Sequence, residues 1–573
     1  MTGREQASRP PPRPRKHWGW GFEDQQPSPD EVEAAASGAR RHLGFAPADV
    51  ERPIALEDVE LPPSRLEPPA SLAHICRTDR YERATHSYGK GYRDIIRAFR
   101  GRYDHPPEVV AHPTDEAEVE RVLAWCEEAG AAAIPFGGGT SVVGGVEPPG
   151  DRPSVTIDLR SMDRVLDVDR TSRAARIQAG AEGPRLERQL REHELTLRHF
   201  PQSFEYSTLG GWIATRAGGH FATLYTHIDD FVESVRAVTP RGLWESRRLP
   251  GSGAGPSPDR MLIGSEGILG VITEAWVRVQ DLWCFKQSAS VLFDSFESGA
   301  RAVRALSQSG LHPSNCRLLD GEEAALTGAV PQMSAADLRR SGAPRWLQAE
   351  GARAALLVVG FESADHELDA WIDRAMELCQ SNGGYLRSES GQSRGGSRRP
   401  RAGHEEPQER QQREEPATPE SAWRDAFLQA PYLRDTLVAA GIFVETYETA
   451  VTWERLDGLV ATVRERIREA LGGDGTVTCR LTHVYPDGAA PYFTVLAPAR
   501  RGDELAQWEE VKAAASEAIS AGGGTITHHH AVGRDHRPWY DRQRPDPFAD
   551  ALKAAKAAVD PAGILNPGVL IDP

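Results

Sequence analysis

The segment AAAIPFGGGTSV, residues 131–142, joins an apolar run to three consecutive glycines and two hydroxyl side chains. The run 131–136 is typical of a short buried strand, and the glycines mark the turn that follows it. Because Gly137, Gly138 and Gly139 carry no Cβ atom, their backbone N–H groups can approach an anion closely. The segment is suited to a pyrophosphate, although an isolated run of three glycines is most simply a tight structural turn.

The same glycines do not complete the Rossmann dinucleotide motif. That motif needs G-x-G-x-x-G at the opening of a helix. Gly137 and Gly139 occupy the first two glycine positions, but Val142 stands at the third. Gly144 and Gly145 follow and are typical of a loop. A Rossmann nucleotide fold is therefore disfavoured.

Three further segments combine small residues and hydroxyl groups in the same way. They read PQSFEYSTLGG (201–211), ATRAGG (214–219) and GSEGILGVIT (264–273). Groups of this kind can bind phosphate, ribose and a flat ring through backbone contacts. Four such loops in one region indicate a dinucleotide site. The predicted cofactor-binding residues are Pro135, Phe136, Gly137, Gly138, Gly139, Thr140, Ser141, Pro201, Ser203, Ser207, Thr208, Gly210, Gly211, Ala214, Thr215, Arg216, Ala217, Ser265, Glu266, Gly267, Gly270 and Val271.

The surrounding pattern predicts two α+β domains. In the first, 101–280, residues 113–116 are a helix-start signal, and apolar residues follow on one helical face. A hairpin is expected over 232–246, turning at Pro240-Arg241-Gly242. A second mixed domain is expected over 281–520, and residues 521–573 return to glycine-rich turns and a helix. The other strands expected in the first domain are 131–136, 154–159, 165–169, 175–180 and 271–279, with a helix over 184–195.

Composition narrows the class of protein. At 573 residues the chain is too long for one small core. A net charge of -16 gives no long-range attraction to nucleic acid, so no nucleic-acid partner is expected, and an anionic substrate would need a local basic pocket. The six cysteines are scattered without metal-ligand spacing, which fits a reducing cytoplasm. No apolar run reaches the roughly 20 residues of a membrane helix, and no signal peptide is evident.

Two stretches have a low-complexity composition. Residues 1–15 are rich in Pro and Arg and are expected to be a flexible tail, followed by a helical and extended segment over 16–100. Residues 388–419 carry almost no large apolar side chain and are expected to be a disordered insertion in the second domain. Neither stretch can bury enough apolar area to offset the entropy of ordering it.

Several of the loops resemble those of one flavoprotein superfamily. IPFGGGTSV (134–142), the block 201–219 and IGSEGILGVITEA (263–275) are similar to the FAD-binding loops of the p-cresol methylhydroxylase and vanillyl-alcohol oxidase superfamily. The resemblance implies an α+β fold in which FAD lies between two subdomains, with an α+β cap domain over the flavin ring. Members with covalent flavin carry a His or Cys near the ring. The first loop has neither, so non-covalent FAD is expected.

Further segments resemble the alkyldihydroxyacetonephosphate (alkylglycerone-phosphate) synthases. The similarity runs from about residue 16 to 570 and fails only near 388–419. That family replaces the acyl chain of acyl-dihydroxyacetone phosphate by a fatty alcohol, through a flavin N5 adduct and without net redox change. The resembling segments are KHWGWG (16–21), RATHSYG (83–89), RLLD (317–320), YLRD (432–435), CRLTHVY (479–485) and THHHAVG (527–533).

The resemblance also implies roles for single residues. Tyr485 matches the family's acid/base tyrosine, Arg434 the arginine that grips the substrate phosphate, and Arg317 a second arginine needed for activity. Taken alone, these residues have plainer interpretations: a half-buried core tyrosine, a solvated ion pair with Asp435, and a structural buttress. His86 is included in the predicted catalytic set, with a structural histidine as the equal alternative.

His528, His529 and His530 complete the predicted catalytic set. In the resembling family this triple borders the flavin, and a neutral imidazole suits proton removal next to a carbonyl. Two alternatives remain open. On a strand, His528 and His530 would share one face and could bind a metal, but three consecutive histidines cannot all point at one ion, so no metal is predicted. The triple could also be a merely polar strand end.

Three functions follow from these observations. The first is ether-lipid synthesis from a ketone phosphate, as in the resembling family. The second is FAD-dependent oxidation of a 2-hydroxy acid or alcohol by hydride transfer to N5, because one fold serves many chemistries. The third is a structural or regulatory flavoprotein. A small-molecule or lipid substrate and a cytoplasmic location are expected, while peripheral membrane contact and a homodimer remain open.

The glycine loops and the absence of His or Cys in the first loop lead to a simple test. We expect the purified protein to be yellow, and acid or heat to release intact FAD that mass spectrometry identifies. A colourless protein that takes up no FAD would refute the assignment of the first domain. A flavin that stays bound to the denatured chain would refute non-covalent binding.

Overall fold

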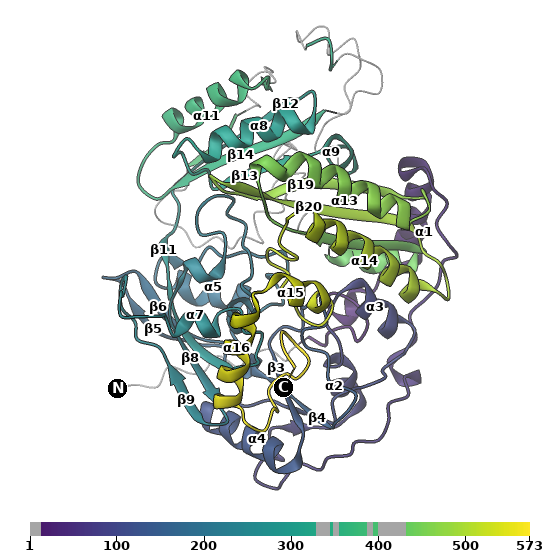
Figure 1. The fold of residues 1–573 in the computed structure, drawn as a ribbon, viewed down its shortest axis with the longest axis vertical. Coiled ribbons are helices and arrows are strands. Elements are labelled where there is room, and N and C mark those ends of the chain that lie inside the picture. The colour runs from purple at the N-terminus through teal and green to yellow at the C-terminus, as the bar shows by residue number, and fades with distance from the viewer. Residues whose placement is uncertain (1–12, 328–343, 348–353, 387–393, 399–430, 573) are drawn as a thin grey trace.

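The computed structural model describes residues 13–327, 344–347, 354–386, 394–398 and 431–572. Two halves lie one above the other along the long axis of the molecule (Figure 1). The lower half holds a four-stranded and a five-stranded sheet, and the upper half holds one large sheet. No helix in the described ranges is long and apolar enough to cross a membrane.

The four-stranded sheet carries the glycine loop. Its order is β1-β2-β4-β3, with β2, β4 and β3 parallel. Helix α4 begins where the Asp115 side chain accepts a hydrogen bond from the N–H of Glu118, and it joins β2 to β3. The loop at 137–141 therefore leaves the carboxyl end of an edge strand. The bounds are β1 Cys76–Arg77, β2 Val109–Ala111, β3 Ala132–Phe136, β4 Ser154–Asp158, α2 Arg80–Thr85, α3 Tyr92–Phe99 and α4 Glu116–Ala129.

The five-stranded sheet is antiparallel, in the order β5-β6-β10-β8-β9. The predicted hairpin is confirmed, since β8 and β9 pair from Thr239 and Gly242 outward. A short ladder of β7 and β11 follows beside it. The bounds are β5 Val165–Asp169, β6 Ala174–Gln178, β7 Leu195–Thr196, β8 Val232–Thr239, β9 Gly242–Glu245, β10 Val271–Arg278, β11 Gln280–Asp281, α5 Gly183–Arg191, α6 Leu209–Thr215 and α7 Asp259–Leu262.

The upper sheet, the cap, runs β15-β12-β14-β13-β19-β20-β17, with β16 on β12 and β18 on β20. Helices α8, α11 and α13 cover its outer face, and α14 packs beside α13 (Figure 1). The bounds are β12 Phe285–Phe293, β13 Asn315–Leu319, β14 Ala355–Ser363, β15 Tyr385–Leu386, β16 Arg394–Arg398, β17 Ile442–Glu448, β18 Val451–Thr452, β19 Thr476–Val484, β20 Gly488–Pro498, α8 Phe296–Ser307, α9 Gly321–Leu326, α11 Asp369–Ser381, α13 Leu456–Ala470 and α14 Glu504–Ala521.

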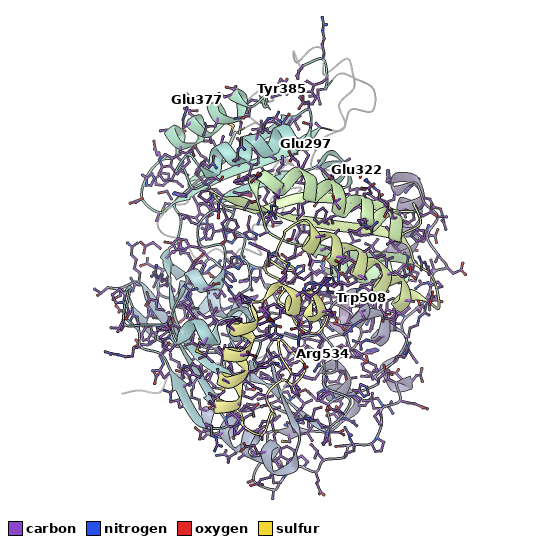
Figure 2. The ribbon with its side chains drawn as sticks, in the orientation of Figure 1. Glu297, Glu322, Glu377, Tyr385, Trp508 and Arg534 are labelled. Carbon is purple, nitrogen blue, oxygen red and sulfur yellow. The ribbon has the colours of Figure 1, made fainter. Side chains whose placement is uncertain are left out.

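Residues 13–22 and the carboxyl-terminal loop 527–533 both lie at the junction between the halves. The carboxyl-terminal segment carries α15 (Arg537–Gln543) and α16 (Asp546–Val559), and α1 spans Pro29–Gly38. Arg534 donates to the backbone oxygens of Glu147 at 3.0 Å and Pro567 at 2.7 Å (Figure 2). Trp508 on α14 donates to the buried carboxylate of Glu445 at 2.8 Å. Arg534 therefore anchors the carboxyl-terminal segment to the lower half, and Trp508 ties α14 to the cap sheet.

Residues 13–22, here called the N-terminal strap, connect the glycine loop to the cap. Arg15 donates to the backbone oxygen of Gly138 at 2.6 Å. Lys16 Nζ lies 2.8 Å from Asp435 Oδ2, and both side chains are 1% exposed. The backbone N–H of Trp20 donates to the same carboxylate at 3.0 Å. A buried ion pair therefore locks the strap to the cap helix at residues 431–439.

Two predictions need correction. Arg15 falls within the expected flexible tail, but it is anchored at Gly138 and forms a β-bridge with Phe22, while residues 1–12 lie outside the described residues. Within the expected disordered insertion, Arg394–Arg398 form β16 and pair with β12. A ladder of backbone hydrogen bonds needs no apolar side chains, which is why composition did not reveal this strand. The rest of 388–419 is not described.

The Lys16–Asp435 pair predicts a large stability effect. Asp435→Ala leaves the Lys16 ammonium buried without its partner, which should cost about 3 to 5 kcal/mol and lower Tm in calorimetry. The matched control is Glu469→Ala, which breaks the Arg466–Glu469 pair, whose side chains are 58% and 56% exposed. It should cost less than about 1 kcal/mol. Equal, small shifts for both variants would show that the buried pair does not anchor the strap.

Candidate active site

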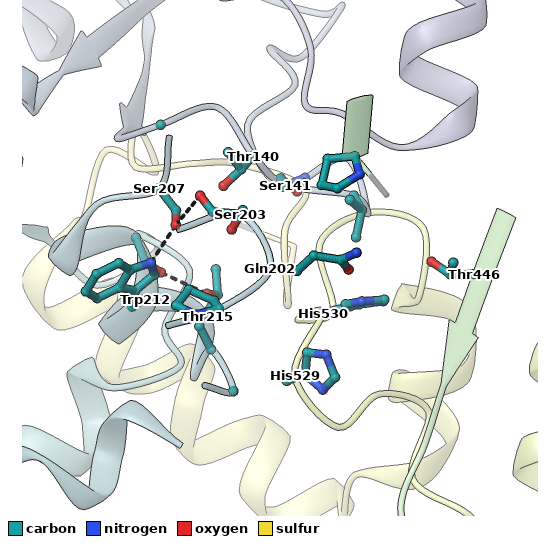
Figure 3. A pocket seen from close by; sticks show the side chains of 18 of the residues that line it. Thr140, Ser141, Gln202, Ser203, Ser207, Trp212, Thr215, Thr446, His529 and His530 are labelled. Carbon is teal, nitrogen blue, oxygen red and sulfur yellow. Dashed lines mark hydrogen bonds between the residues drawn. The ribbon is translucent and has the colours of Figure 1, made fainter. Parts of the chain in front are cut away.

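A cavity of about 480 Å³ lies between the two halves. The predicted cofactor loops line it from below, the cap sheet and cap helices from above, and the histidine loop of the carboxyl-terminal segment from the side of the junction. Figure 3 shows His529 and His530 facing the hydroxyl-rich loops across this space, with Gln202 between them. The volume of this cavity is typical of small-molecule and cofactor sites.

The glycine loop packs too closely for side chains and leaves backbone donors free. Gly139 has a φ of +66°, which L side chains rarely adopt. A Cβ on Gly138 would lie 1.9 Å from the backbone oxygen of Tyr206, and one on Gly137 would lie 2.2 Å from Thr208 Oγ1. Among the described residues, the backbone N–H groups of 138–141 donate to no partner. This row of free donors has the chemistry that the diphosphate of FAD requires.

Most predicted cofactor-binding residues line the cavity, but three do not. Arg216 turns to Asp229, with 2.7 Å between Nη2 and Oδ2. Val271 is fully buried in β10, and Ser265 is buried beside the lining. The residues that do line it are Pro135, Phe136, Gly137, Gly138, Gly139, Thr140, Ser141, Pro201, Ser203, Ser207, Thr208, Gly210, Gly211, Ala214, Thr215, Ala217, Glu266, Gly267 and Gly270.

Strand alternation gives the cap a polar inner face. Along β19, Val477, Cys479 and Leu481 join the apolar core on the outer side, while Thr478 and Arg480 line the cavity. The strands β13 and β20 add Arg317, Tyr492 and Thr494 to the inner face. The cap therefore turns cationic and hydroxyl groups toward the cofactor loops.

Two arginines and a tyrosine form the centre of this face. The guanidinium carbon of Arg480 lies 3.9 Å from the ring centroid of Tyr492, and Arg480 Nη1 pairs with Glu323 at 2.5 Å. Arg317 donates to the backbone oxygen of His220 at 2.9 Å. Burial, with the positive charge of Arg480 adding to it, lowers the pKa of Arg317 to about 9. Arg317 thus stays cationic at neutral pH and favours a bound anion.

Glu448 holds the histidine loop in place. Its buried carboxylate accepts hydrogen bonds from the backbone N–H groups of His528, His529 and His530 at 2.7 to 3.2 Å and from the Thr527 hydroxyl at 2.6 Å. Burial opposes ionisation, but the nearby imidazoles and the Thr527 hydroxyl hold the pKa of Glu448 well below its ordinary value. The carboxylate is therefore charged.

The histidine triple lies on a loop, so the alternatives that place it on a strand are wrong. A strand would have put the first and third rings on one face, whereas the Glu448 carboxylate gathers the three backbone amides and spreads the rings. His529 and His530 line the cavity and contact Tyr492, with ring centroids 6.1 and 5.6 Å away. Burial lowers the pKa of His530 to about 3 and also lowers that of His529. Both are neutral at neutral pH and able to accept a proton.

Three predicted catalytic residues do not line the cavity. His86 is buried, with Nε2 3.2 Å from Asp158 Oδ2, and its ring packs on Phe136. This placement matches the structural alternative. Tyr485 and His528 lie behind the cavity wall, and the Tyr485 hydroxyl is 2.6 Å from His528 Nε2. Tyr492, seven residues along the hairpin, is the tyrosine that faces the cofactor loops.

The histidines also form the cluster that comes nearest to a metal site in the described part of the chain. Ring nitrogens of His483, His528 and His529 all lie within 4.8 Å of one another. However, His483 Nε2 is 3.0 Å from the Gly219 carbonyl and His528 Nε2 is engaged with Tyr485. Donors committed in this way do not converge on one ion. Proton transfer explains the cluster better than metal binding does.

Arg434 lines the cavity from the cap helix at residues 431–439. It is buried rather than solvated, with Nη1 3.6 Å from Glu445 Oε1 and 3.4 Å from the backbone oxygen of Lys90. Its neighbour Asp435 points away and pairs with Lys16. The plainer alternative for Arg434, a solvated ion pair with Asp435, is therefore wrong.

Sequence reasoning missed Glu448, Tyr492 and Arg480. The available signal was alternation: in IFVETYE and CRLTH, charged residues recur among apolar ones on strands that must be buried on one side. A buried strand that retains a carboxylate or guanidinium indicates a partner on the inner face. For Glu448 that partner is the segment 527–530, which lies about eighty positions further along the sequence.

Replacing Glu448 tests the role of this carboxylate. Glu448→Gln keeps the volume, but its amide nitrogen cannot accept, so buried backbone N–H groups lose partners at about 1 to 3 kcal/mol. We expect faster hydrogen exchange at residues 528–530. Because the native pKa of Glu448 is depressed, its contribution is present above the unfolded pKa and is lost as pH falls toward the native pKa. Unchanged exchange, equal to that of the exposed control Glu454→Gln, would contradict this role.

Comparison with known proteins agrees with this site. A family model described as FAD binding domain matches residues 107–246, and one described as FAD linked oxidases, C-terminal domain, matches 285–570. An alkyldihydroxyacetonephosphate synthase of Trypanosoma brucei brucei is 30% identical over 507 residues, covering 86% of this chain and 78% of the relative. The predicted FAD cofactor and the prediction of an enzyme are confirmed.

Solved structures agree on the fold. An alkyldihydroxyacetonephosphate synthase structure matches with a TM-score of 0.77 and 26% identity, over 96% of this chain and 98% of that one. Substrate-bound p-cresol methylhydroxylase matches with a TM-score of 0.63 at 14% identity, over 95% and 98%, and so shares the fold. The predicted α+β FAD-binding fold with a cap is confirmed. The chain belongs to the alkyldihydroxyacetonephosphate synthase family.

Proposed function

We propose that this enzyme exchanges the acyl chain of an acyl-dihydroxyacetone phosphate for a fatty alcohol, which forms the ether bond of an ether lipid. The observation that carries the proposal is the composition of one cavity. It joins the FAD loops to a cationic cap face and to an apolar mouth. A phosphorylated headgroup with a long chain needs both of these surfaces.

The headgroup phosphate is assigned to the guanidinium groups of the cavity. Arg317, Arg434 and Arg480 all line it, whereas Glu323 is the acidic side chain that lines it from the cap. Glu323 is committed to Arg480 and to the hydroxyl of Thr478. The surplus of positive charge suits a dianion, and a planar guanidinium binds phosphate oxygens in pairs.

Proton transfer at the headgroup carbon is assigned to Tyr492 and the two histidines beside it. Burial raises the pKa of Tyr492, so its hydroxyl stays protonated and able to donate. His529 and His530 are neutral and can accept a proton. When bound, FAD supplies the reactive ring at which the headgroup exchanges its substituent, and these side chains hold and move the protons around it.

The long chain is assigned to the mouth of the cavity. Leu433 and Leu326 line it and are 50% and 40% exposed. Leu437, Val444 and Leu496 continue the apolar wall inward. Exposed large apolar side chains of this kind mark a site for an apolar ligand or a membrane surface. Membrane contact, a homodimer, a cytoplasmic location and non-covalent attachment of FAD stay predictions.

The alternative function, oxidation of a 2-hydroxy acid or alcohol, has less support. A carboxylate could pair with the same arginines, but it would leave the apolar mouth unused. Anaerobic mixing separates the two functions. A hydroxy acid that reduces the flavin, together with no alkyl ether from acyl-dihydroxyacetone phosphate and a fatty alcohol, would overturn the proposed synthase.

The two tyrosines form a matched pair for testing the active site. Tyr492→Phe removes one hydroxyl beside His529 and His530 and should lower turnover by roughly 100-fold or more, with FAD content unchanged. Tyr485→Phe should lower turnover less, because its hydroxyl lies behind the cavity wall. Alkyl ether formation is measured by mass spectrometry.

Arg434→Ala extends this test to the phosphate. It should weaken headgroup binding about 10- to 150-fold, the equivalent of one lost charge-assisted hydrogen bond.

For the tyrosine pair, one outcome would contradict the assignment. If Tyr485→Phe is the inactive variant and Tyr492→Phe is fully active, the assignment to Tyr492 is wrong.

A further inference from the structure

His227 ends a chain of side chains that begins in the cavity. His529 lines the cavity, and its Nδ1 lies 3.0 Å from His528 Nδ1. On the other side of the His528 ring, Nε2 lies 3.1 Å from His227 Nε2 and 2.6 Å from the Tyr485 hydroxyl. That hydroxyl is also 3.3 Å from His227 Nε2. Each contact is within hydrogen-bonding distance.

The far end of this chain approaches solvent. His227 is partly exposed, and it follows the exposed residues Leu224 and Tyr225. His227 Nδ1 lies 2.9 Å from the backbone oxygen of Arg216. Because a carbonyl only accepts, this nitrogen carries the proton, which leaves Nε2 of neutral His227 as an acceptor toward His528 and Tyr485.

We propose that His529, His528 and His227 form a proton exit from the cavity to solvent, with the Tyr485 hydroxyl bridging its last step. Each imidazole takes a proton on one ring nitrogen and releases one from the other. A proton taken up at the cavity side of His529 passes through the paired Nδ1 atoms to His528. It then passes through the paired Nε2 atoms to His227, and the partly exposed His227 ring gives up a proton to solvent water.

This inference rests on the proposed function, whose reaction releases a proton. The bond between the headgroup carbon and the acyl oxygen breaks, and a bond to the alcohol oxygen forms. The fatty acid leaves as a carboxylate at neutral pH, so the proton of the alcohol is released without any change in redox state. One proton must therefore leave the site in each turnover.

The surroundings suit transit rather than storage of a proton. His483, His529 and Glu448 face the inner part of the chain, and Asp229 and Asp230 lie near its outer end. Burial lowers the pKa of His528 well below its ordinary value, with His227 and His529 adding to the effect. A proton placed on His528 is thus unstable and moves on. The Tyr485 hydroxyl, with its pKa raised to about 12 by burial, stays protonated.

His227→Asn is the sharpest variant. The amide can occupy the place of Nδ1 and keep the bond to Arg216, but no group replaces Nε2. We expect kcat to fall roughly 10- to 100-fold, below the effect of a directly acting base, with KM and FAD content unchanged. Added imidazole should restore kcat in proportion to its concentration, and the solvent deuterium effect on kcat should increase. A merely structural histidine would give neither response.

His193→Asn, at an exposed histidine of the same half, is the matched control and should behave as the wild type. His227→Gln is the second variant if the first does not fold. An unchanged kcat, or a fall that imidazole does not reverse, would overturn the proton exit. Failure of the wild type and of His193→Asn to form any alkyl ether would instead overturn the proposed function, so the two failures are distinguishable.

Discussion

The carboxylate of Glu448 is the group on which the catalytic side of the cavity depends. It is buried in the last residue of β17 and accepts from three successive backbone amides and a hydroxyl of the histidine loop. An unpaired buried carboxylate would be very costly, and so would three buried amides without acceptors. Each cost is offset only by the other group. The hydrogen bonds between this carboxylate and the backbone amides therefore hold the loop in place without regular secondary structure.

The cap sheet meets a second constraint, because one sheet must serve two environments. Its outer face is covered by helices and takes apolar residues, while its inner face meets the cofactor loops and takes arginines, threonines and Tyr492. The charges on that face are brought near neutrality by neighbours such as Glu323 and Glu445, but an excess of guanidinium remains. That excess favours an anionic ligand over a neutral one.

Local chemistry made the lower half predictable. Glycines, hydroxyls and strand patterns act within a few residues, so the loops from Pro135 to Gly270 could be identified from sequence. Local patterns could not show which of Tyr485 and Tyr492 faces the cavity. The pairing of β19 with β20 shifts between Leu481 and His483, and such a bulge changes which side chains face inward. The motif around Tyr485 therefore lies past the bulge, while Tyr492 faces the site. Partners distant in sequence, such as Glu448 and residues 528–530, carry no local signal.

The N-terminal strap has a consequence for how the chain reaches its native state. Lys16 and Asp435 are separated by 419 residues in sequence. During synthesis the strap is made before the cap, so the Lys16 ammonium has no partner until most of the cap has been made. Until then the side chains of Trp18 and Trp20, which are buried in the native protein, stay exposed to solvent. Contacts of such long range slow folding and leave apolar surface open to aggregation, so the strap is among the last segments to reach its native position.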